Sequence, residues 1–136
     1  MSLSRPAYLR IVRASAWYDL VVTAPFFTPW SFAVARDQLS TLNGQLGGAA
    51  LPAFDPFHTL FVCLLGSIVL VWSVLRLRAP SVALGRYDGA GRLLFSLWTL
   101  WALRFTGAPL LWLFVVPELA WGVAQWLPVT KQDSRV

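Results

Sequence analysis

The sequence predicts an all-α integral membrane protein, a single domain of residues 1–136 built as a four-helix transmembrane bundle. Hydrophobic residues fill 57% of the 136 positions and charged residues only 12%, about half of the roughly 25% typical of soluble domains. So few charges cannot cover a surface that faces water. The hydrophobic residues also gather into four runs, each near the roughly 20 residues that a transmembrane helix needs.

The four expected spans follow one another with one long connection. They cover residues 14–35, 57–75, 89–105 and 109–127, with an outer loop at 36–56. Pro25 and Pro29 make the first span irregular, because proline interrupts the hydrogen bonds of a helix. In the outer loop, "RDQLSTLNGQL" either continues the first helix or forms a short interfacial helix. The link "FTGAP" is so short that the last two spans form an antiparallel hairpin.

The basic residues orient the bundle. One side of a four-span topology receives Arg5, Arg10, Arg13, Arg76, Arg78, Arg86, Lys131 and Arg135. The other side keeps Arg36 and Arg104, balanced by Asp37 and Asp55. By the positive-inside rule both termini are expected in the cytoplasm, with the protein in a bacterial inner membrane. The net charge of +5 does not predict nucleic-acid binding, since no binding motif accompanies it; we expect contacts with membrane lipids instead.

The chain offers little for a cofactor or a metal. Its one cysteine, Cys63, lies in an apolar run and has no partner for a disulfide or a zinc site. Its one histidine, His58, follows Asp55 and Pro56, which are expected to begin the second helix. A lone histidine does not predict haem or metal, so we expect no cofactor.

Charged residues inside the spans are the candidate functional groups, because an Asp or Arg at the centre of a membrane helix costs about 3 kcal/mol. Glu118 is the deepest and follows Pro117 in the fourth span. It is either a ligand or proton site, or a structural partner of a neighbouring helix. Asp19 and Arg92 lie at similar depth, so we expect them to form an ion pair, structural or in contact with a ligand. Asp88 lies four residues before Arg92 and shares its helix face.

Eight tryptophans are many for this length. Those near span ends, Trp17, Trp30, Trp72, Trp112 and Trp126, are typical of an interfacial aromatic belt. Trp98, Trp101 and Trp121 lie deeper, and they line an apolar pocket, face lipid or simply pack against other helices. Tyr18 flanks Asp19. The candidate ligand-binding residues are therefore Glu118, Asp19, Arg92, Trp98, Trp101, Trp121 and Tyr18, and none is assigned a catalytic role.

The acid of the first helix, the long outer loop and the proline of the fourth helix resemble the EXPERA group, which includes the emopamil-binding and sigma-2 receptor proteins. The similarity covers the architecture, and no motif matches residue by residue. It implies an isomerase with Glu118 as the acid or base and Asp19 as the second group.

Three functions fit this sequence. The first is binding, or transport, of a lipid-like or amphiphilic small molecule in a cavity lined by acids and tryptophans. The second is an accessory subunit of a larger membrane complex or a homo-oligomer, whose polar groups hold helices together. The third is the EXPERA-like isomerase. They differ in what Glu118 and Asp19 contact.

Overall fold

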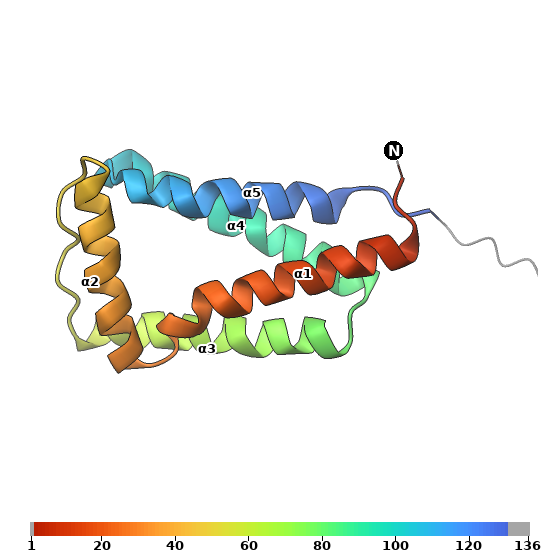
Figure 1. Cartoon of the computed structure of the whole chain (residues 1–136), viewed down its shortest axis with the longest axis horizontal. Helices are drawn as coiled ribbons and strands as arrows, with labels where there is room; N and C mark the ends of the chain where they lie inside the picture. The colour runs from red at the N-terminus through yellow and green to blue at the C-terminus, as the bar shows by residue number, and fades with distance from the viewer. Residues whose placement is uncertain (1, 131–136) are drawn as a thin grey trace, which may run out of the picture.

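The computed structural model describes residues 2–130, which form five α-helices joined by loops and short 3₁₀ turns (Figure 1). The α-helices are α1 (Arg5–Thr23), α2 (Pro29–Gln45), α3 (Pro56–Arg78), α4 (Val82–Thr106) and α5 (Trp112–Trp126). The 3₁₀ turns are Ala24–Phe26 and Pro109–Leu111. The predicted all-α class is confirmed.

The helices are arranged as two pairs and a crosspiece. α1 packs beside α3, and α4 packs beside α5 as the expected antiparallel hairpin (Figure 1). α2 crosses the far end of both pairs (Figure 1). At the near end, the Leu3 N–H donates to the Pro128 carbonyl at 2.8 Å, and the Thr130 N–H donates to the Leu3 carbonyl at 2.9 Å. The two ends of the described chain therefore lie side by side.

The expected first span, residues 14–35, is not one helix. α1 begins at Arg5 and ends at Thr23, and α2 begins at Pro29. Proline has no N–H to donate, so Pro25 and Pro29 cannot continue the ladder of α1. Pro29 instead opens α2, where no donor is needed, and the Thr28 side chain caps that helix by accepting from the Ser31 N–H at 3.2 Å. "RDQLSTLNGQL" thus belongs mostly to a separate helix.

α3 and α4 reach further toward each other than the sequence predicts. Arg76 lies within α3, which ends at Arg78, and α4 begins at Val82 instead of near residue 89. The Ser81 hydroxyl caps α4 by accepting from the Leu84 N–H at 3.1 Å. At the other end of α3, Asp55 caps the helix as expected. The His58 N–H donates to its carboxylate at 2.9 Å, and this hydrogen bond lowers the pKa of Asp55.

Gly66 in α3 lies directly against the backbone of the 3₁₀ turn Ala24–Phe26. A Cβ at this position would lie 2.6 Å from the Phe26 carbonyl oxygen, which is backbone and cannot move away by itself. We expect Gly66→Ala to lower the free energy of unfolding by about 1–3 kcal/mol through overpacking. Gly91→Ala is the matched control, because no atom lies within 4 Å of its Cβ position. It should stabilise α4 by about 0.5–1 kcal/mol. Thermal unfolding in one detergent measures both, and equal shifts in Tm would contradict the assigned contact.

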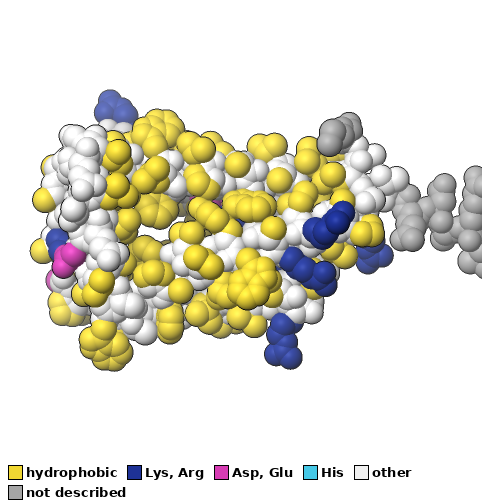
Figure 2. Space-filling model, in the orientation of Figure 1, with side chains coloured by type: hydrophobic (Ala, Val, Ile, Leu, Met, Phe, Trp, Pro, Cys, Tyr) yellow, Lys and Arg dark blue, Asp and Glu magenta, His cyan; other side chains and the backbone are white. Residues whose placement is uncertain are grey.

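The distribution of side chains is the reverse of that in a soluble domain. Hydrophobic side chains cover the sides of the bundle, and arginines gather at the end where the chain begins (Figure 2). The interior holds fully buried polar groups, among them Asn43, Ser73 and Gln125, beside a small apolar core that includes Tyr8 and Val12. Within residues 2–130, α3 alone is both long enough and apolar enough to cross a membrane by itself.

Candidate functional site

Five ionisable side chains meet inside the bundle and form what we call the charged cluster. The charged cluster consists of Asp19 on α1, Arg76 on α3, Asp88 and Arg92 on α4, and Glu118 on α5. It joins α1, α3, α4 and α5. Exposure of the side chain rises from 0% at Arg76 to 18% at Glu118, so Glu118 is the member that outside molecules reach most easily.

Arg76 is the most deeply buried member. Its two terminal nitrogens donate to the carboxylates of Asp19 and Asp88. They also donate to the hydroxyls of Ser15, at 3.1 Å, and Ser73, at 3.3 Å. Ser73 and Arg76 are three residues apart and share the inward face of α3. A guanidinium has five N–H groups in a fixed fork, and it is therefore suited to bridge two helices at once.

Arg92 connects three acids. Its Nη2 donates to Asp19 Oδ2 at 2.7 Å, its Nε to Asp88 Oδ2 at 3.1 Å and its Nη1 to Glu118 Oε2 at 3.0 Å. The expected Asp19–Arg92 ion pair is therefore present, and so is the pair four residues apart on α4. Both arginines bind Asp19 Oδ2, which places two positive charges at one carboxylate.

Asp88 is the best-coordinated acid. Its Oδ2 accepts from Arg76, from Arg92 and from the Gln125 amide, the last at 2.6 Å, while Oδ1 accepts from Trp72 Nε1 at 2.7 Å. Gln125 also donates to Ser15 at 2.8 Å. Gln125 follows Glu118 by seven residues, two turns along the same face of α5. Asp88 thus links α4 to both α3 and α5 through neutral as well as charged donors.

Contacts of Tyr8 and Arg86 with the end of α5 cover the charged cluster on the side of the arginine-rich end. The buried Tyr8 hydroxyl donates to the Gln125 carbonyl at 2.7 Å. Arg86 donates to the same carbonyl at 2.7 Å and to that of Leu127 at 2.9 Å, and it stacks on the rings of Tyr8 and Trp126. A cation at the last carbonyls of α5 also complements the helix dipole. These contacts separate the cluster from that end of the molecule.

The charges of the cluster do not balance. Three carboxylates face two guanidiniums, which leaves one negative charge in excess when all are ionised. Asp19 and Asp88 each contact both arginines, whereas Glu118 contacts Arg92 alone and uses only Oε2. Buried charges are stable only when they are paired. Glu118, the most exposed of the three acids, is therefore the acid with the least compensation from the arginines.

The aromatic candidates divide into two groups. Tyr18 and Trp121 are partly buried, and their ring centres lie 6.0 Å apart. Tyr18 directly precedes Asp19 in the sequence, and Trp121 lies about one helical turn after Glu118. Trp98 and Trp101 are 61% and 58% exposed. At 100° per residue they lie roughly 120° and 180° around α4 from Arg92. Among the described residues they thus face outward, away from the charged cluster, rather than toward the interior.

The spans expected from the sequence end at residue 75 and begin at residue 89, so they leave out Arg76 and Asp88, and these bounds are corrected by the structure. Both side chains are buried, because α3 and α4 extend past the expected boundaries. The sequence spacing held a signal for this burial, because Asp88 and Arg92 are one helical turn apart, as are Ser73 and Arg76. Lys131 and Arg135, expected on the side of the termini, lie outside the described residues.

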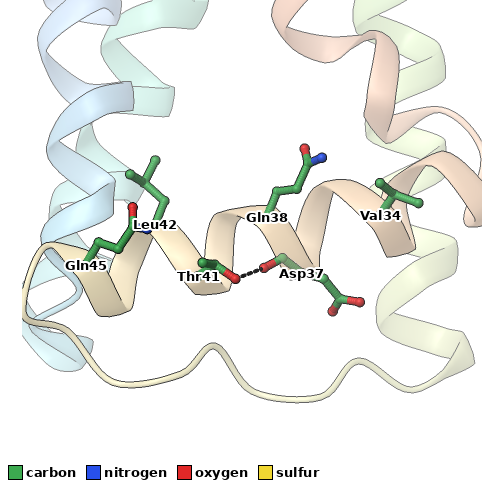
Figure 3. Close-up of a pocket in the computed structure, with 6 residues that line it drawn as sticks. All are labelled: Val34, Asp37, Gln38, Thr41, Leu42 and Gln45. Atoms are coloured by element: carbon green, nitrogen blue, oxygen red, sulfur yellow. Dashed lines mark hydrogen bonds between the residues drawn. The ribbon is translucent and has the colours of Figure 1, made fainter.

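Two surface depressions lie apart from the cluster. One, of about 430 Å³, is lined only by residues of α2, namely Val34, Asp37, Gln38, Thr41, Leu42 and Gln45 (Figure 3). Nearly all of these side chains are exposed. The other, of about 370 Å³, is an apolar groove on α3 beside Trp72. Neither depression is lined by a member of the charged cluster.

Comparison with protein-family models, with curated proteins and with solved structures found no match for this chain. The chemistry of the charged cluster is therefore the guide to function.

Proposed function

We propose that this chain is a four-span membrane protein that binds an amphiphilic small molecule with a cationic headgroup at Glu118. The observation that carries the proposal is that three carboxylates meet only two guanidiniums in the buried cluster, and that Glu118, the most exposed of the acids, has the fewest ion-pair contacts. An ammonium group beside the unused Oε1 of Glu118 would balance its carboxylate.

The exterior supports a membrane environment. Large apolar side chains such as Phe57, Ile68 and Phe105 are each about two-thirds or more exposed, far more than water-facing helices tolerate as a continuous surface. Besides α3, the 19-residue α1 has a length of about 28 Å at 1.5 Å per residue, close to the roughly 30 Å of a hydrocarbon core. α4 is longer, and the turn at Pro109–Leu111 extends α5.

The ion pairs of the charged cluster support the proposal that helices carrying charged residues cross the membrane. α1, α4 and α5 carry Asp19, Asp88, Arg92 and Glu118, which would be costly facing lipid. All four are turned inward and paired. Four crossings would put both ends of the chain on one side, consistent with the pairing of Leu3 with residues 128–130. The exposed arginines at that end make it the cytoplasmic side under the positive-inside rule.

The surroundings of Glu118 favour a cationic amphiphile over a free ion. The rings of Tyr18 and Trp121 lie beside this acid on α1 and α5, and aromatic faces attract ammonium groups by about 0.5–2 kcal/mol. The outer surface of the same helices also carries exposed apolar side chains, among them Val21 and Val123, so a hydrocarbon tail could remain in the lipid while the headgroup reaches the carboxylate.

Glu118→Gln tests the charge at the site. In maltoside micelles, dodecyltrimethylammonium at about 100 times its Kd should stabilise the native protein by about 2.7 kcal/mol, seen as a rise of several degrees in Tm. Glutamine keeps the shape and a hydrogen bond to Arg92 but removes the excess charge. We expect the rise in Tm to disappear in this variant, and dodecyl sulfate to give no such rise in either protein.

The control is Asp37→Asn, which removes an exposed acid of α2 whose side chain is 73% exposed. It should leave the rise in Tm unchanged. Native mass spectrometry of protein extracted in mild detergent adds a second readout. A bound small cation that is lost in Glu118→Gln supports the proposal. Additional protein chains without a small mass would instead assign the cluster to an assembly subunit.

A further inference from the structure

We infer that the outward face of α1 is a binding site for one anionic phospholipid, with the phosphate held by Arg10 and Arg13 and the lipid body lying along Trp17 and Val21. This inference rests on the membrane embedding proposed above, but not on ligand binding at Glu118.

The four residues form one continuous strip, which we call the lipid strip. At 100° per residue, Arg10, Arg13, Trp17 and Val21 fall within roughly 80° of one another around α1. The buried residues Tyr8, Val12, Ser15 and Asp19 lie on the opposite side of the helix. All members of the lipid strip are exposed, Trp17 to 58% and Val21 to 69%. The strip therefore faces away from the bundle.

The order of residue types along the lipid strip matches the layers of a membrane leaflet. From the chain end inward, it presents two arginines, then a tryptophan, then an aliphatic residue. Arginine suits bidentate contact with phosphate, tryptophan prefers the glycerol level of the interface, and valine suits the hydrocarbon. Arg10 and Val21 are about 16 Å apart at 1.5 Å per residue, which is enough to pass from a headgroup to the upper acyl chain.

The charges at this end of the molecule have no protein counterpart among residues 2–130. Of the five acids in that range, Asp19, Asp88 and Glu118 are engaged in the charged cluster. The other two, Asp37 and Asp55, pair with Arg36 and His58 at the α2 end. Arg78, at the end of the neighbouring α3, adds a further exposed positive charge. Figure 2 shows the arginines gathered there without exposed acids among them. Anionic lipid supplies the missing charge.

A lipid titration tests the strip. The full chain in nanodiscs is titrated with phosphatidylglycerol or phosphatidylcholine of the same acyl chains, and retained lipid is counted by native mass spectrometry. The double variant R10Q/R13Q should bind phosphatidylglycerol about 30-fold more weakly, because each arginine near an anionic surface contributes about 1 kcal/mol and 1.4 kcal/mol is tenfold. Phosphatidylcholine binding should stay the same.

The matched control is R104Q, which removes an exposed arginine from the opposite end of the bundle. It should leave phosphatidylglycerol binding within twofold. An equal loss in R104Q would show that overall charge, not the strip, attracts the lipid. An unchanged affinity in R10Q/R13Q would show that these arginines serve another partner, such as an acidic protein. Either result overturns the inference while leaving the Glu118 proposal intact, whereas failure to enter nanodiscs overturns the membrane embedding itself.

Discussion

Replacing Arg76 with methionine is expected to lower the free energy of unfolding by about 3–5 kcal/mol, because it removes one partner from a buried ion network. Arg76 is fully buried and binds both Asp19 and Asp88. Without it, three carboxylates face the single guanidinium of Arg92. Methionine retains much of the volume, so the loss reports charge more than packing. Thermal unfolding in a fixed detergent should show Tm falling by about 10 °C or more.

Arg78→Met is the control for this prediction. It removes the same charge two residues further along α3, from a side chain that is exposed. Surface substitutions of this kind usually change stability by no more than about 0.5 kcal/mol. If Arg78→Met lowered Tm as much as Arg76→Met, the effect would come from the basic end of α3 and not from the charged cluster.

The Asp19–Arg92 ion pair of the charged cluster could be predicted, because a charge within an apolar helix is costly unless it is paired. Asp19 and Arg92 stand in apolar runs at similar depth, and their pairing inside the bundle follows from that cost. The contact of Glu118 with Arg92 was one of two alternatives that the sequence left open. The Asp55 cap was predictable from the local sequence, since Asp followed by Pro is a strong helix-start pattern.

Arg76 escaped prediction because a charge near the end of an apolar run has two solutions. An arginine side chain is long enough to extend outward to the interface, and the positive-inside rule favours that choice. Here Arg76 turns inward, since Asp19 and Asp88 lie within reach on neighbouring helices. Only the position of those helices decides between the two, and that position depends on long-range packing.

The orientation of Trp98 and Trp101 was not predicted, although the sequence of α4 held a signal for it. In a helix that is apolar on all sides, hydrophobic periodicity does not mark the inner face. The polar stripe of Asp88, Arg92 and Ser96 does mark it on α4, and all three side chains are buried. In such a protein the buried polar residues, rather than the apolar ones, fix the rotation of each helix.

Asp88→Ala is expected to be nearly as damaging as Arg76→Met, at about 3–5 kcal/mol. Alanine removes the acceptor shared by Arg76, Arg92 and Gln125, and leaves Trp72 Nε1 without its partner. Asp88→Asn should cost less, because its amide oxygen still accepts hydrogen bonds while the charge is lost. Tm values in the same detergent order the two variants. Equal Tm values would indicate that Asp88 acts through charge alone.

The double variant Arg76→Met with Asp88→Asn separates pairing from burial. Each single change leaves the other group buried with one charged partner fewer, whereas the double change removes both charges of the Arg76–Asp88 pair. We therefore expect the two losses to be less than additive, with a coupling energy of about 0.5–3 kcal/mol, as for residues in direct contact. Strict additivity would mean that the surrounding hydrogen bonds from Trp72 and Gln125 hold Asp88 in place, and that the Arg76 contact contributes little to stability.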